Sequence, residues 1–170
     1  EKRLMLSYEH AKSPFSSNAY LPKSESFDRS IAYYSQGKMY DLDFNYALRY
    51  DFNERLTSTK NYEDSAFSIS TNTSQQITNN LSYNLGLSHV SRSPNMAELF
   101  ADGKHGPTNR YEKGDSSLER EVSKNIDLGL QFTSGDSIID LSLYRNDVKD
   151  FIYLRDLGTT SYDGEHQDAN

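Results

Sequence analysis

Residues 40–51 read Tyr-Asp-Leu-Asp-Phe-Asn-Tyr-Ala-Leu-Arg-Tyr-Asp, an almost strict alternation. Every second side chain is apolar or aromatic, and those between them are polar or charged apart from Ala47. Successive side chains of a β-strand point to opposite faces, so this stretch predicts a long strand with one apolar and one polar face. Such a strand is suited to a wall that separates hydrocarbon from water.

The same alternation recurs along the chain and predicts about seven strands in all. Several of the alternating runs continue for about ten residues, close to the roughly 9 to 11 that cross a bilayer. Besides 40–51, strands are expected at 4–10, 27–34, 67–71, 81–89, 125–132 and 139–144.

The connections between these runs are of two kinds. Short polar turns are expected at 36–38, 78–80 and 134–136, and long segments at 11–25, 51–63, 92–119 and after Gly158. An antiparallel up-and-down sheet with tight turns at one end and long loops at the other is typical of a transmembrane β-barrel of the outer membrane, with the tight turns on the periplasmic side. The sequence therefore predicts an all-β fold whose long loops face outside the cell.

Composition agrees with this class. The mean hydropathy is -0.82, and no stretch approaches the roughly 20 apolar residues of a transmembrane helix. The chain has no cysteine, which excludes disulfides and thiolate metal sites. The net charge of -7 argues against nucleic acid as a partner and suits a surface that attracts cations.

Three other classes are compatible with parts of the pattern. A soluble β-sandwich also alternates, but its strands usually run about 5 to 6 residues. An outer-membrane enzyme is suggested by Ser88, His89 and Ser91, but adjacent strand residues point to opposite faces, and we expect no enzyme. A passive porin would differ by having no saturable ligand site.

Seven strands are too few for a bacterial barrel, which uses even numbers from about eight upward. The alternation of apolar and polar residues has also already begun at Leu4, and the last residues are polar. We therefore expect the sequence to be a fragment, with further strands on both sides.

One series of motifs resembles the barrel of TonB-dependent outer-membrane receptors. The resemblance implies a 22-stranded barrel of a Gram-negative outer membrane, of which residues 1–170 form a part, with the terminal strands and an N-terminal plug outside this sequence. It also implies uptake of a scarce nutrient, with outer-membrane lipids around the barrel and the TonB complex as partner through that plug. The motifs are Ser91 to Phe100, Tyr111 to Asp115, Leu118-Glu119, Asn125 to Leu130 and Leu143 to Val148.

The segment 101–109 is similar to an extracellular loop of the zinc-uptake receptors of this family. Imidazole and carboxylate groups are suitable Zn²⁺ ligands where no thiolate is present. We expect no resident cofactor, and zinc is the first choice as transported ligand. The candidate metal ligands are His105, Glu98, Asp102 and Glu112, together with His166 and Glu165 from the next outside loop.

Haem is the alternative ligand, because a histidine can bind its iron axially. Haem receptors of the family carry a histidine between an Arg-x-Pro box and a later Asn-Pro-x-Leu box. Arg92 and Pro94 fit the first box, whereas 114–118 keeps little of the second beyond Leu118. A ferric siderophore is the next alternative. His10 and His89 share the parity of apolar neighbours, and we expect both to face lipid near the membrane interface.

Overall fold

The computed structural model describes residues 1–13, 20–108, 110–156, 158, 161–162 and 167–168. Seven long strands form one antiparallel sheet, which confirms the predicted number and the up-and-down order. They are β1 Lys2–Ser13, β2 Ser24–Met39, β3 Leu42–Thr57, β4 Asn61–Gln76, β5 Leu81–Arg92, β8 Glu121–Ser134 and β9 Ser137–Lys149. The remaining described elements are α1 Met96–Phe100, β6 Asp102–His105, β7 Arg110–Lys113, β10 Ser161–Tyr162 and β11 Gln167–Asp168. No helix among them is long and apolar enough to cross a membrane.

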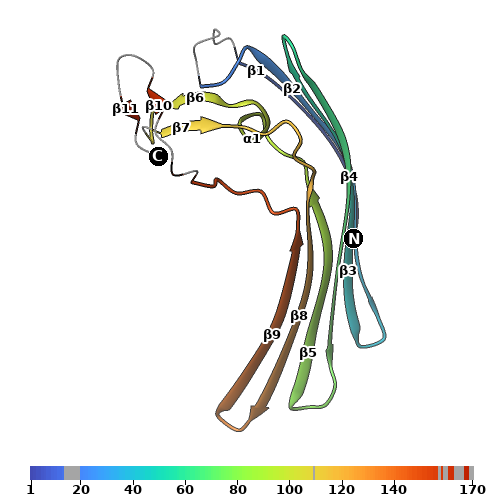
Figure 1. The fold of residues 1–170 in the computed structure, drawn as a ribbon. Coiled ribbons are helices and arrows are strands. Elements are labelled where there is room, and N and C mark those ends of the chain that lie inside the picture. The colour runs from blue at the N-terminus through green and yellow to red at the C-terminus, as the bar shows by residue number, and fades with distance from the viewer. Residues whose placement is uncertain (14–19, 109, 157, 159–160, 163–166, 169–170) are drawn as a thin grey trace.

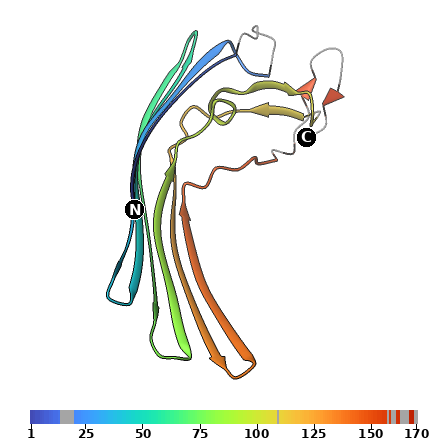
Figure 2. The same ribbon diagram turned by 180° about the vertical axis from the view of Figure 1, so that it is seen from behind.

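The sheet is a curved open wall whose two ends differ (Figure 1). One end, which we call the turn end, carries the short connections 40–41, 77–80 and 135–136. The opposite end, the loop end, carries the connections 14–23, 58–60 and 93–120. Seen from either side, α1, β6 and β7 lie over the concave side of the wall at the loop end (Figures 1 and 2). The predicted turns at 78–80 and 134–136 and the long connection 92–119 are thereby confirmed.

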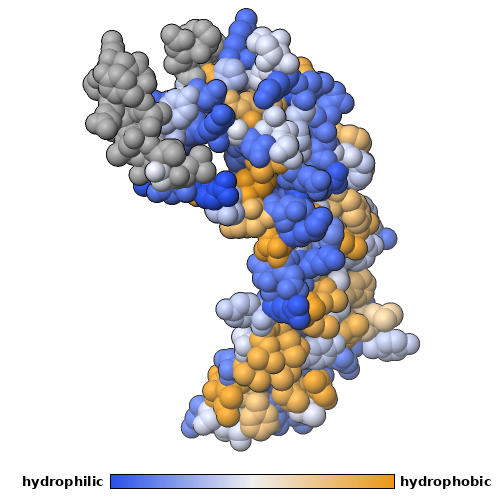
Figure 3. Space-filling view, viewed as in Figure 1, coloured by the Kyte–Doolittle hydropathy of each residue, from blue (hydrophilic) through white to orange (hydrophobic). Residues whose placement is uncertain are grey.

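Apolar side chains line up in rows across the convex face. Directly opposed residues of neighbouring antiparallel strands share a face, so the register defines each row. Some large apolar members are exposed, as expected of a face that meets lipid: Leu4 is 66% and Leu143 is 56% exposed, whereas Leu48 and Leu128 are half-buried. Hydrophobic side chains gather toward the turn end around β9 in the space-filling view (Figure 3). Two such rows are Leu4, Tyr33, Leu48 and Ile69, and Leu85, Leu128 and Leu143.

The opposite, concave face is mainly polar, with apolar side chains such as Ile138 and Val148 on β9. In the register, Gln36, Asn45 and Asn72 form one row near the turn end, and Asp28, Asn53 and Asp64 form another near the loop end. The predicted division of residues 42–51 into an apolar and a polar face is therefore confirmed.

The predicted loop at 51–63 is wrong. Strand β3 continues to Thr57, and a short turn at 58–60 leads directly into β4. The alternation of hydrophobicity ends here because both faces become polar: on the convex face, Glu54 lies directly opposite Glu63. The backbone hydrogen bonds between β3 and β4 do not depend on apolar side chains, so β3 continues beyond the end of the alternating pattern. The predicted long connection at 11–25 is also shortened, since β1 reaches Ser13 and β2 begins at Ser24.

The predicted turn at 36–38 is also wrong, because these residues belong to β2 and the chain reverses at 40–41. Tyr40 adopts a φ of 55° and is 93% exposed, so it starts no strand. Gly37 lies opposite Phe44 inside the ladder, and a Cβ added to Gly37 would approach Phe44 Cζ to 2.9 Å. The glycine therefore makes room for an aromatic ring, a role that the sequence pattern does not distinguish from that of a turn glycine.

Candidate functional site at the loop end

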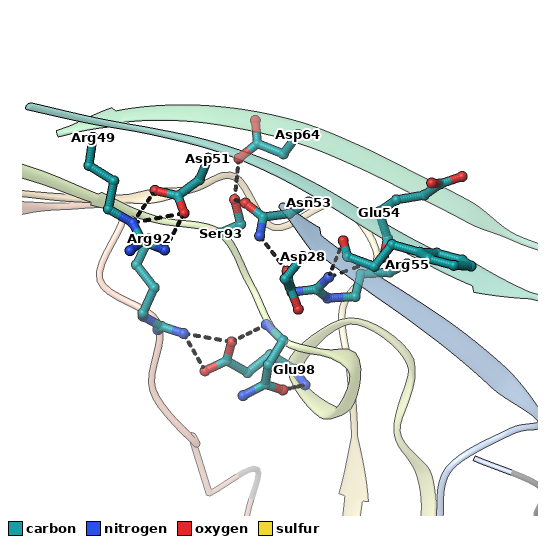
Figure 4. Close-up of polar contacts among 12 residues, drawn as sticks. Asp28, Arg49, Asp51, Asn53, Glu54, Arg55, Asp64, Arg92, Ser93 and Glu98 are labelled. Carbon is teal, nitrogen blue, oxygen red and sulfur yellow. Dashed lines mark hydrogen bonds and ion pairs between the residues drawn. The ribbon is translucent and has the colours of Figure 1, made fainter. Parts of the chain in front are cut away.

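The connection between β5 and β8 is fastened to the concave wall by four polar residues, which we call the loop anchor: Asn53, Asp64, Ser93 and Arg120. The Ser93 hydroxyl donates to the Asp64 carboxylate at 2.7 Å and lies 3.0 Å from Asn53 Oδ1. Arg120, from the far end of the connection, donates to the other Asp64 oxygen at 2.5 Å. Figure 4 shows Ser93 between Asn53 and Asp64. Asp64 therefore holds both ends of the connection.

The wall behind the loop anchor is itself cross-linked. Asn53 donates to Asp28 on the neighbouring strand, and Arg55 pairs with the same carboxylate at 2.7 Å (Figure 4). The side chain of Arg55 is only 9% exposed. The Asp28 carboxylate of β2 therefore links to two residues of β3 beneath the loop.

Helix α1 begins with a capping box that also engages Arg92. The Asn95 side chain accepts from the Glu98 backbone N–H, and Glu98 Oε2 accepts from the Asn95 N–H at 2.7 Å. Arg92 binds both oxygens of Glu98, at 2.9 and 3.1 Å (Figure 4). Its guanidinium group also lies 3.5 Å from Glu121. Arg92, the arginine of the Arg-x-Pro motif, therefore links the end of β5 to α1.

The small apolar core of the loop end lies between α1 and the segment after β7. Leu99 and Pro94 are fully buried. Gly114 passes so close that an added Cβ would meet the Leu99 carbonyl carbon and the Phe100 nitrogen at 2.6 Å. Its N–H donates to the Ala101 carbonyl at 2.7 Å. This close passage requires glycine and fixes the β6–β7 hairpin to α1.

His105 lies at the end of β6 in a compact group, the His105 cluster, made of Tyr20, His105, Thr108 and Glu112. Its ring stacks on Tyr20, with centroids 4.5 Å apart and planes inclined by 14°. Nδ1 lies 3.0 Å from Glu112 Oε1 and 3.2 Å from the Thr108 hydroxyl. Tyr20 donates to the other Glu112 oxygen at 2.6 Å. A backbone bond from the Asp102 N–H to the Tyr20 carbonyl, at 3.1 Å, joins the two loops beside the cluster.

The electrostatics of the cluster favour an ionised Glu112. Burial alone would raise the pKa of Glu112, but the hydrogen bonds from Tyr20, His105 and Thr108 outweigh it and lower that pKa below its ordinary value. Burial and the bond to Glu112 raise the pKa of Tyr20 to about 12. An ionised carboxylate only accepts hydrogen bonds, so Nδ1 of His105 carries the proton and a neutral ring keeps its lone pair on Nε2.

The structure brings one of the proposed zinc ligands, Glu112, to His105. Glu98 is held by Arg92 and its own capping box, and Asp102 accepts from Tyr111 at 2.7 Å. His166 and Glu165 lie outside the described residues. Within the described ranges, no three His, Cys, Asp or Glu side chains are grouped so that they could hold a metal ion. The zinc site therefore stays a prediction.

Sequence reasoning missed Tyr20 and Thr108. Tyr20 is far from His105 in sequence and lies in a connection without periodicity, so no local signal marks it. Of the other histidines, His10 has the expected convex parity: it stacks on Phe27 at 4.3 Å and lies 3.2 Å from Glu25. His89 shares its row with Ile69, also as expected.

The sheet is open, curved and antiparallel, with an apolar convex face, a mainly polar concave face and a folded connection over its loop end. These features are typical of part of an outer-membrane barrel wall. Comparison with known proteins agrees: the family model described as TonB dependent receptor-like, beta-barrel matches residues 6–168. The chain belongs to this family, which comprises receptors and transporters of the Gram-negative outer membrane and is not a family of enzymes.

The curated relatives carry a more specific name. Heme/hemopexin utilization protein C of Haemophilus influenzae strain 86-028NP is 27% identical over 132 residues, which cover 69% of this chain and 19% of that protein. The protein of the same name from strain Rd is 28% identical over 141 residues, covering 73% of this chain and 20% of that protein. The chain thus spans about a fifth of the length of these relatives.

Proposed function

We propose that the chain forms part of the wall and outer mouth of a TonB-dependent outer-membrane receptor that takes up haem. The proposal replaces zinc by haem as the first choice of ligand. The observation that carries it is the name shared by the relatives, heme/hemopexin utilization protein, in a family of nutrient receptors. The His105 cluster supplies a chemical group that suits this ligand.

An imidazole can serve as an axial ligand of haem iron through one ring nitrogen. In the His105 cluster, Glu112 engages Nδ1, and Nε2 has no hydrogen-bond partner among the residues that the structure describes. The His105 side chain as a whole is 33% exposed, so the ring is only partly covered by the cluster. The hairpin that carries it lies over the concave side at the loop end, the side from which a ligand would enter a barrel (Figure 1).

Zinc is retained as the second candidate, because one imidazole and one carboxylate already lie together at His105 and Glu112. A further ligand would have to come from residues such as His166 and Glu165, outside the described part. A catalytic or structural zinc usually has three or four protein ligands, so the described pair alone is an incomplete site.

The test is a parallel calorimetric titration of the full-length receptor with haemin, Zn²⁺ and a ferric siderophore. We expect saturable binding of haemin that is weakened at least tenfold by His105→Ala and unchanged by His10→Ala, a histidine on the convex face. Saturable zinc binding that depends on His105, without haemin binding, would overturn haem in favour of the second candidate. Binding of the siderophore alone would leave the assignment to the receptor class unchanged and would exclude both haem and zinc as the ligand.

A further inference from the structure

We propose that Tyr20 and Glu112 are positioning residues that hold the His105 ring ready to ligate haem iron, so that two separate loops jointly build one axial ligand. The inference rests on the proposed function. It assigns a role to Tyr20, which lies between β1 and β2, and to Glu112 on β7.

The two contacts restrict different motions of the ring. Stacking on Tyr20, at 4.5 Å and 14°, fixes the plane in which the imidazole lies. The bond of Nδ1 to Glu112, at 3.0 Å, fixes its rotation within that plane and hence the direction in which Nε2 points. With both contacts in place, the ring loses little freedom when it binds a ligand, because it is already ordered.

Glu112 also acts on the chemistry of the ring. A metal-binding histidine commonly donates its second N–H to a carboxylate, which fixes the tautomer and makes the ligating nitrogen more basic. Here the carboxylate is itself held: Tyr20 donates to its second oxygen at 2.6 Å, and the Glu112 side chain is only 13% exposed. Tyr20 thus positions His105 twice, directly by stacking and indirectly through Glu112.

Tyr20 does not fit the role of a second iron ligand. Its ring faces that of His105 at stacking distance and is nearly parallel to it, so the two side chains cannot bind opposite faces of one porphyrin. Its hydroxyl group is already committed to Glu112.

The hairpin supplies a matched control for the loss of the tyrosine hydroxyl group. Tyr111 donates to Asp102 at 2.7 Å, so it is likewise a tyrosine bound to a carboxylate between β6 and β7, but it pairs with Lys104 in the register and has no hydrogen bond to the His105 cluster. Tyr111→Phe therefore removes the same type of bond beside the cluster. Tyr20→Phe keeps the stack and loses the bond to Glu112, and Glu112→Gln keeps the shape and loses the charge.

The experiment measures haemin affinity, the absorption spectrum of bound haemin and its reduction potential in the full-length receptor. We expect Glu112→Gln to weaken haemin binding about tenfold or more, in the range found for partners of metal ligands. It should also raise the reduction potential, since a less basic imidazole stabilises ferric iron less. Tyr20→Phe should weaken haemin binding by less than Glu112→Gln, and Tyr111→Phe should match the wild type in affinity, spectrum and potential.

The outcomes separate the two proposals. If His105→Ala abolishes the histidine-ligated spectrum but Glu112→Gln and Tyr20→Phe both bind haemin with the wild-type affinity, spectrum and potential, the positioning role is overturned and the proposed function stands. If Tyr111→Phe loses as much affinity as Glu112→Gln with an unchanged spectrum, the effect belongs to general folding of the hairpin and the role is likewise overturned. If haemin binds the wild type and His105→Ala with identical spectra, His105 is not the ligand.

Discussion

Along β3, Leu48 on the convex face and Asn53 on the concave face lie only a few positions apart but are held by different kinds of interaction. Leu48 belongs to a row of apolar side chains that is repeated from strand to strand. Asn53 belongs to a polar group that includes residues from the 93–120 connection. The comparison shows that the wall depends on a periodic property of the sequence, whereas the loop end depends on individual long-range contacts.

The largest effect is expected where the wall meets lipid. Leu48→Arg places a charge in an apolar row and should destabilise the full-length receptor by about 2–4 kcal/mol, the cost found near the bilayer midplane. The measurement is denaturant unfolding of the receptor in lipid vesicles. Asn45→Arg, on the concave face of the same strand, is the control and should cost much less; equal losses would contradict the assignment of the two faces.

At the loop end, the next largest effect is expected from Gly114→Ala. The new methyl group would lie 2.6 Å from the backbone of Leu99 and Phe100, and overpacking of this kind costs about 1–3 kcal/mol. Hydrogen exchange should show faster opening of α1 and β7 while the wall stays protected. Gly106→Ala is the matched control, since an added Cβ there meets nothing within 4 Å. Equal exchange in the two variants would argue against the close packing at Gly114.

Breaking the loop anchor should have a somewhat smaller effect. Asp64→Ala removes the acceptor of both Ser93 and Arg120, and we expect a local loss of about 1–2 kcal/mol, since Arg120 is 40% exposed and water replaces part of the pairing. Limited proteolysis should then cut the 93–120 connection sooner. Asp43→Ala, whose carboxylate is 59% exposed and 3.9 Å from Lys38, should leave the cleavage rate unchanged.

The smallest effect is expected at the helix cap. Asn95→Ala removes the side chain that accepts from the Glu98 N–H and should destabilise α1 locally by about 1 kcal/mol. Asn95→Asp keeps an acceptor and should restore most of the protection of α1 amides against hydrogen exchange. If both variants exchange like the wild type, the capping box contributes nothing to the loop end.

The periodic part of the fold was predictable from sequence because period-two hydrophobicity records which face meets lipid. The prediction failed where that cause is absent. At Glu54 and Glu63 the convex face is polar as well, so the pattern predicts a loop where the strand continues. At Gly37 the residue type suggested a turn, although the glycine accommodates the ring of Phe44.

The candidate site was predictable only in part. Glu112 was found because a hairpin brings it to His105 from a short distance along the chain. Tyr20 and Arg120 act through contacts with distant segments, and such contacts leave no periodic trace in the sequence. The choice of haem over zinc came from the relatives and not from the residues alone.

The measurement that tests the central claim most directly is growth of iron-starved cells on haemin as the sole iron source, with the full-length receptor as their only route for haemin. The wild-type receptor should support growth only when TonB is functional, and His105→Ala should abolish growth while His10→Ala supports it. Growth that persists with His105→Ala, or that needs no TonB, would contradict the account.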